Sequence, residues 1–140
     1  MISPLFALIP NQPGIYISII EDENFKCTDT LQEYADSIEA TLHINEFNFE
    51  KKRYTKHAVL YDFLFVCADI DERDDILEIA NKIYRVLKNA GHTFVLSKKE
   101  STYKLNEIFE ESNFVAINTI SLDEEYDIIS AKKMHGWKRV

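Results

Sequence analysis

The 140-residue chain contains little glycine, proline and cysteine, with three, three and two residues respectively. So few glycines and prolines leave little room for linkers or low-complexity segments. Cys27 and Cys67 are far apart and form no C-x-x-C motif, which favours two reduced thiols in a cytoplasmic protein over a disulfide or a metal pair. With 46% hydrophobic and 29% charged residues, the composition predicts one globular domain spanning residues 1–140.

Long apolar runs and metal-binding patterns are absent as well. No apolar segment approaches the roughly 20 residues that cross a bilayer, so we expect no membrane association. The apolar N-terminal segment 1–10 has no preceding basic residue and no small-residue cleavage site, which argues against a signal peptide. The four histidines have no zinc-motif spacing, and we therefore expect no metal site.

Positive charge is scarce, because the formal net charge is −8. A surface of that sign repels phosphate backbones, so nucleic-acid binding is not expected. Two basic segments depart from the average. One contains Lys51, Lys52 and Arg53, and the other places Trp137 among the basic residues of the C-terminal tail. These residues are our candidates for an interaction surface. The alternatives are a solvated loop and a tail folded back over the core.

Apolar patterns predict alternating strands and helices. Helices are expected from Thr30, which has capping-box spacing to Glu33, to Leu42, over 74–88, and around 105–109. Gly91 is placed to take the left-handed conformation that ends the second of these helices. Strands are expected over 15–20, 41–49, 60–68, 93–96, 114–120 and 126–131.

This order of elements predicts an α/β fold with a mostly parallel sheet covered by helices on both faces, a three-layer arrangement. The last two strands are joined by the short segment 121–125, which is too short for a crossover helix. We therefore expect an antiparallel hairpin at the C-terminal side of the sheet.

Three features resemble the C-terminal half of class I S-adenosylmethionine-dependent methyltransferases. They are the Tyr61-Asp62 start of a long apolar strand, the segment from Leu87 to Gly91 between a helix and a strand, and the terminal hairpin. The resemblance covers about residues 60–133. It implies a shortened, Rossmann-like methyltransferase fold.

The family binds its cofactor with a glycine-rich loop after the first strand. If the segment 15–20 is that strand, the loop here is Glu21-Asp22-Glu23-Asn24-Phe25-Lys26, which contains no glycine. In a second alignment, 15–20 is the family's second strand, and one of the three carboxylates binds the ribose. Both alignments predict a weakened or lost cofactor pocket.

The resemblance also indicates which residues carry function if the pocket survives. Glu21, Asp22 and Glu46 are then the candidate cofactor-binding residues, and Asp69 is the candidate catalytic residue that faces the substrate. The alternative for Glu46 is a solvated carboxylate at a strand end. For Asp69 it is a residue that only adds charge at the start of the next helix.

These observations lead to two main hypotheses. The first is a non-catalytic methyltransferase-like domain without a cofactor, which acts as a binding or assembly module with a homodimer or protein partner. The alternative is an active small methyltransferase that binds S-adenosylmethionine in an atypical pocket. An RNA-associated accessory protein that uses the basic segment 51–57 is a third hypothesis, which the net charge disfavours.

Overall fold

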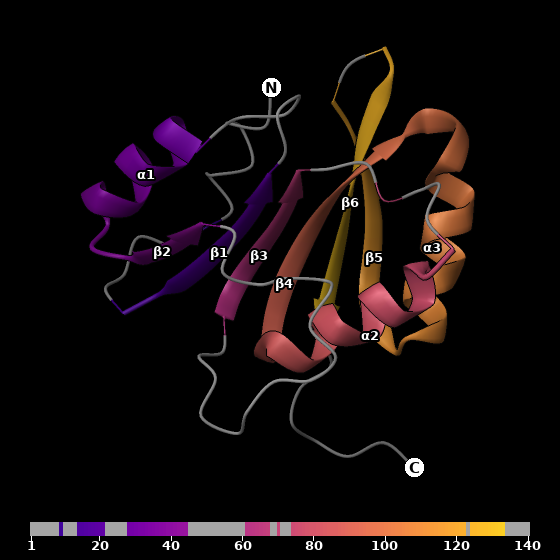
Figure 1. Ribbon diagram of the computed structural model, residues 1–140, viewed down its shortest axis with the longest axis horizontal. Helices are drawn as coiled ribbons and strands as arrows, with labels where there is room; N and C mark the ends of the chain where they lie inside the picture. Colours follow the sequence, from indigo (N-terminus) through magenta and orange to yellow (C-terminus); the bar gives the residue numbers. More distant parts are fainter. Residues whose placement is uncertain are drawn as a thin grey trace.

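The computed structural model describes residue 9 and the ranges 14–21, 28–44, 61–67, 70, 74–122 and 124–133. Figure 1 shows the strands as one twisted sheet, with α1 beside β1 and β2 at one end and α2 and α3 near β4 to β6. The elements are β1 (Tyr16–Glu21), α1 (Thr28–Ser37), β2 (Thr41–Ile44), β3 (Tyr61–Cys67), α2 (Ile76–Val86), β4 (Leu87–Lys98), α3 (Thr102–Glu111), β5 (Phe114–Ser121) and β6 (Tyr126–Lys133).

The six strands lie in the order β2-β1-β3-β4-β6-β5. The pairs β1–β2, β1–β3 and β3–β4 are parallel, whereas β4–β6 and β5–β6 are antiparallel. The predicted α/β fold with a mostly parallel sheet and an antiparallel C-terminal hairpin is therefore confirmed.

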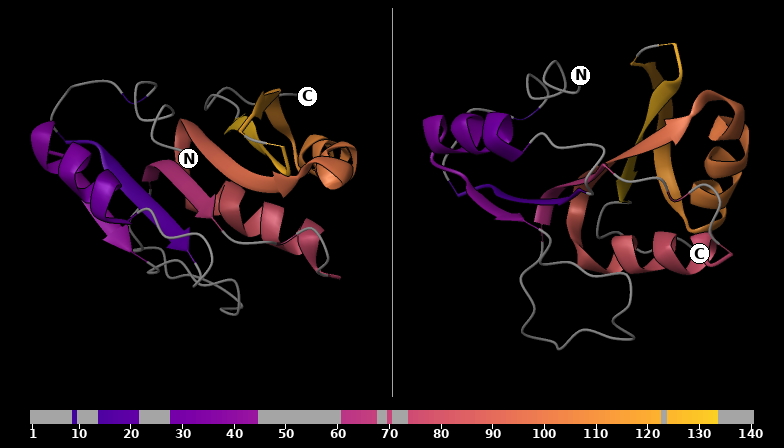
Figure 2. Two further views of the ribbon diagram at one scale, coloured as in Figure 1. Left: turned by 90° about the horizontal axis from the view of Figure 1, so that it is seen from above. Right: turned by 45° about the horizontal axis from the view of Figure 1, so that its top comes forward.

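Helices cover both faces of the sheet, because apolar side chains on the central strands point both ways. On β3, Leu64 and Val66 pack with α2 and α3, whereas Phe63 and Phe65 pack with α1. Such two-sided burial is expected of a strand in a parallel sheet. Figure 2 (right) shows α1 and α2 on opposite sides of the strands. The sheet and its two helical layers form the predicted three-layer arrangement.

The boundary between α2 and β4 differs from our prediction. The helix ends at Val86 and β4 begins at Leu87, so Gly91 lies inside a strand and does not end a helix. Its φ is not positive; Ala90 has φ 68° instead. Gly91 is needed for space, because a Cβ atom would lie 2.9 Å from the carbonyl oxygen of Lys88 and 3.1 Å from that of Tyr61. Because glycine has no Cβ atom, β4 can lie close to the start of β3 at this position.

Smaller differences concern the N-terminal half. Helix α1 begins at Thr28, two residues before the predicted cap, and ends at Ser37. The residue that turns the chain after it is Glu39, with φ 59°. Strand β2 covers only Thr41–Ile44, and residues 45–49 of the predicted strand lie outside the described residues. These differences lie at the ends of the elements, where a boundary predicted from sequence is less accurate than the centre of the element.

Candidate functional site

The direction in which the sheet grows reverses between β1 and β3. From β1 the chain adds β2 on one side, and it then returns to place β3 on the other side. In open α/β sheets, ligands bind outside the carboxyl ends of the strands at such a reversal. Here β1 and β3 end together, with Glu21 in register with Cys67. The carboxyl ends of β1 and β3 are therefore the candidate functional site.

One candidate residue from the sequence lies at these strand ends. Glu21 is the last residue of β1, at the carboxyl edge of the sheet. The roles of the other candidate residues stay predictions. Asp22, Glu46, Asp69, Lys51, Lys52, Arg53 and Trp137 lie outside the described residues.

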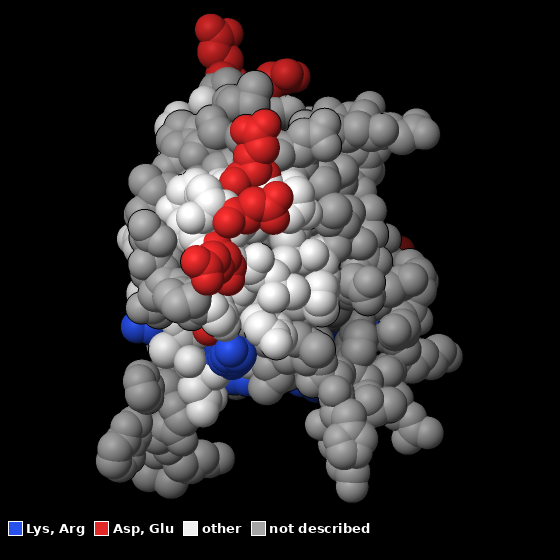
Figure 3. Space-filling model, turned by 90° about the vertical axis from the view of Figure 1, so that its left-hand side faces the viewer, with Lys and Arg blue, Asp and Glu red and all other residues white. Residues whose placement is uncertain are grey.

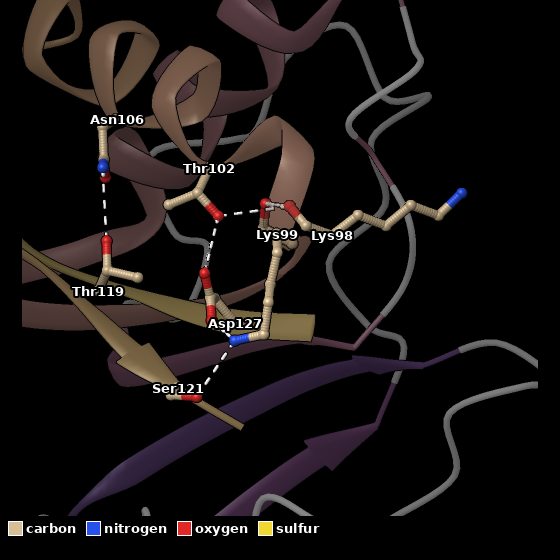
Figure 4. A network of polar contacts seen from close by, with 8 residues as sticks. Lys98, Lys99, Thr102, Asn106, Thr119, Ser121 and Asp127 are labelled. Carbon is tan, nitrogen blue, oxygen red and sulfur yellow. Dashed lines mark hydrogen bonds and ion pairs between the residues drawn. The ribbon is translucent and has the colours of Figure 1, made fainter. Parts of the chain in front are cut away.

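A polar network that sequence reasoning missed lies further along the same edge, where β4 ends (Figure 4). Its centre is the buried Asp127 of β6. The Lys99 Nζ atom lies 2.6 Å from Oδ1 of Asp127 and donates a hydrogen bond to Ser121 Oγ at 3.1 Å. The Thr102 hydroxyl donates to Oδ2 of Asp127 at 3.0 Å. Both oxygens of the carboxylate thus have partners.

This network joins three segments at the carboxyl edge. Lys99 follows β4, Thr102 begins α3, and Asp127 and Ser121 belong to the two strands of the hairpin. The ammonium group of Lys99 is matched by one buried carboxylate, and Figure 4 shows its side chain directed into the network. The network therefore fixes the hairpin and α3 relative to β4. The sequence signal for it is a carboxylate at position 127 between Tyr126 and the apolar pair Ile128 and Ile129.

At the opposite edge, polar contacts hold the beginnings of the strands. Asp62 Oδ2 accepts a hydrogen bond from the backbone N–H of Tyr16 at 2.9 Å and lies 3.3 Å from Lys88 Nζ. On the same side, His43 Nδ1 and the Tyr61 hydroxyl are 2.8 Å apart. These contacts connect β1, β2, β3 and β4. They give Asp62 a structural role at the start of β3.

The surroundings of His92 lower its pKa. The ring of His92 is stacked on Phe63, with 5.7 Å between ring centroids and 12° between the ring planes. Across the antiparallel ladder it is directly opposite Lys132. Partial burial, and to a smaller extent the charge of Lys132, lower the pKa of His92 below its usual value of 6.5.

We expect His92 to make stability depend on pH. In the unfolded chain His92 takes up a proton as pH falls through about 6.5, whereas the folded protein resists protonation until its lower pKa is reached. The unfolded state thus binds more protons, and the stabilising contribution of neutral His92, present above pH 6.5, is lost as pH falls. The urea midpoint should fall more between pH 7.5 and pH 5.5 in the wild type than in His92→Phe. Equal falls in the two proteins would contradict this role.

Among the described residues, no group of three or more histidine, cysteine, aspartate or glutamate side chains could hold a metal ion. In the same part of the chain, no helix combines the length and apolar character needed to cross a membrane.

Comparison with known proteins gives a clear answer for the fold. The sequence matches no family model and no curated protein. In structure, the chain is similar to a SAM-dependent methyltransferase from Aquifex aeolicus, with TM-score 0.68 and 9% identity over 92% of this chain and 87% of the other. A TehB-like SAM-dependent methyltransferase from Corynebacterium glutamicum gives 0.62 and 12% over 92% and 84%. A SAM-dependent O-methyltransferase from Thermotoga maritima gives 0.62 and 14% over 98% and 66%.

At these identities the similarity establishes the fold alone. The chain has a class I methyltransferase-like fold, and the match extends over most of its length. The predicted resemblance is therefore confirmed, and the structural match extends beyond residues 60–133 into the N-terminal part of the chain.

Proposed function

We propose that this chain is a non-catalytic methyltransferase-like domain that works as a binding or assembly module. The observation that carries the proposal is the position of β1. It lies at the reversal of the sheet, where the first strand of a nucleotide-binding α/β fold stands. This position favours the alignment in which the cofactor loop is the glycine-free segment that starts at Glu21.

The chemistry of that segment disfavours the usual cofactor contact. A backbone that approaches a ligand closely uses glycine, because other residues add a Cβ atom and avoid positive φ. In that alignment, Glu21, Asp22 and Glu23 occupy the sequence positions whose backbone N–H groups would face the ligand. Their side chains also place negative charge beside the carboxylate at the methionine end of the cofactor. Both effects weaken binding. A cytoplasmic location and a homodimer or protein partner belong to the same proposal.

The second candidate is an active small methyltransferase with an atypical pocket. It is favoured by the retained topology, since β1 and β3 still end together at the reversal of the sheet. In that case Glu21, Asp22 or Glu46 holds the ribose hydroxyls, and Asp69 faces the substrate.

A calorimetric titration with S-adenosylmethionine and S-adenosylhomocysteine separates the two candidates. We expect no binding heat from protein whose folding is verified by circular dichroism, because the loop after β1 lacks glycine. A dissociation constant near 1 μM, about 8 kcal/mol of binding free energy, would overturn the non-catalytic proposal. In that event Asp69→Ala should abolish methyl transfer without loss of the fold, whereas Asp36→Ala, on the surface of α1, should have no effect.

A further inference from the structure

The two edge strands of the sheet differ in how they are protected. In β5 the register with β6 shifts between Val115 and Asn118, and Ala116 within this bulge has φ 52°. Bulges of this kind prevent a further strand from pairing. Strand β2 pairs with β1 in unbroken register from Thr41 to Ile44, and within the described ranges it pairs with no other strand. Its outer edge thus has the regular geometry that strand addition needs.

The direction of the backbone groups of β2 follows from one hydrogen bond. The N–H of Thr41 donates to the carbonyl oxygen of Ile15, at 2.9 Å, and therefore points towards β1. Alternate residues of a strand direct their backbone groups to opposite sides. His43 therefore also faces β1, whereas the N–H and C=O groups of Leu42 face outward. By the same alternation the N–H of Ile44, the last residue of β2, also faces outward. Leu42 is the residue inside β2 that offers both a donor and an acceptor to an added strand.

The described residues of α1, next to this edge, carry acidic side chains. Helix α1 contacts β2 and contains no lysine or arginine. Glu33, Asp36 and Glu39 recur at intervals of three residues, and all three are exposed. Figure 3 shows acidic side chains in a row across this side of the molecule. Asp36 Oδ1 accepts a hydrogen bond from Gln32 Nε2 at 2.8 Å.

We propose that the outer edge of β2 binds an extended basic segment of a partner protein. The segment adds to the sheet as a strand through the backbone groups of Leu42, and its lysine or arginine side chains lie against the carboxylates of α1. In this mode of recognition, main-chain hydrogen bonds supply affinity and side chains supply selectivity. The inference rests on the proposed binding function and names the chemistry of its partner. Two copies paired through β2 would bring two acidic α1 surfaces together, which disfavours a second copy as the occupant.

The test is a fluorescence anisotropy titration of the full chain. The probe is a fluorescein-labelled nine-residue peptide of alternating lysine and valine, and the control peptide has glutamate in place of lysine. Leu42→Pro removes the outward N–H, and proline is tolerated on edge strands. Leu42→Ala loses the same side-chain contacts and keeps the N–H. We expect the wild type and Leu42→Ala to bind the lysine peptide, and Leu42→Pro to bind it at least about tenfold more weakly, since this edge would lose a main-chain hydrogen bond.

A second pair of variants tests the charge. The triple variant Glu33→Gln, Asp36→Asn, Glu39→Gln should weaken binding and reduce its salt dependence. The triple variant Glu107→Gln, Glu110→Gln, Glu111→Gln makes the same change in net charge on α3, and the affinity should not change.

Three results would overturn the inference: no binding of the lysine peptide, equal affinities of Leu42→Ala and Leu42→Pro, or a dimer in sedimentation that Leu42→Pro dissociates. The cofactor titration is independent of these results. Loss of peptide binding with no cofactor heat rejects the edge inference alone, whereas cofactor heat rejects the proposed function.

Discussion

Replacing Gly91 with alanine should lower the free energy of unfolding by about 2 kcal/mol, the usual range for overpacking at a closely packed position. The added Cβ atom would meet three backbone oxygens, those of Lys88 at 2.9 Å, Tyr61 at 3.1 Å and Asp62 at 3.2 Å. Backbone atoms in a paired strand cannot rotate away as a flexible side chain can. The variant must therefore distort the backbone of β4 near Lys88 and separate β4 from the start of β3. Urea unfolding followed by circular dichroism measures the loss.

Gly14 provides the matched control. It has φ 87° and no atom within 4 Å of the position that a Cβ would occupy. Alanine there suffers only the strain of the left-handed conformation, about 1 kcal/mol. We expect Gly91→Ala to be the more destabilising of the two. A loss at Gly91 equal to or smaller than the loss at Gly14 would show that close approach is not the reason for glycine at position 91.

Replacing Asp127 with alanine should lower the free energy of unfolding by about 3 kcal/mol, because it leaves polar groups in a largely buried site without their partner. The side chain of Asp127 is 12% exposed, and that of Lys99 is 38% exposed. Without the carboxylate, the Lys99 ammonium keeps, among the described residues, the hydroxyl of Ser121, and the Thr102 hydroxyl keeps the carbonyl oxygen of Lys98, at 3.3 Å.

A double-mutant cycle with Lys99→Met isolates the interaction between the two charges. The pair Lys88–Asp62 serves as the comparison, because its side chains are more exposed, at 42% and 31%. Lys88→Met should lower the unfolding free energy by less than about 1 kcal/mol, as usual for a solvated ion pair. If Asp127→Ala is no more destabilising than Lys88→Met, the network at the end of β4 does not hold the hairpin in place.

The elements of the fold were readable from local sequence, and the join between α2 and β4 shows the limit. Apolar residues at 76, 79, 80 and 83 predict the helix correctly, and Leu87 continues their spacing. Leu87 nevertheless begins β4. It is buried in the same apolar cluster as the helix residues, so its apolar character fits either element. The local pattern predicts a helix end at Gly91 because part of its real constraint, the backbone of β3, lies some 30 residues earlier in the chain.

The candidate site was less predictable, for two physical reasons. Its sequence-based residues follow the ends of strands, where no periodic pattern fixes the position of a side chain. The network around Asp127 depends on residues 25 and 28 positions away, and a single strand pattern cannot reveal such partners. The location of the site at the carboxyl ends of β1 and β3 follows only from the order of the strands in the sheet.

The pairing of β1 with β3 also bears on how the molecule folds. Tyr16 and Asp62, which are joined by a hydrogen bond, lie 46 residues apart. In contrast, β3 to β6 with α2 and α3 form one continuous stretch of chain with its own buried cluster. Closing long loops slows the formation of parallel pairs. We expect the C-terminal part to form first and β1 to add late. The candidate site at the ends of β1 and β3 then lies at the boundary between an early and a late folding unit, where a domain opens most readily.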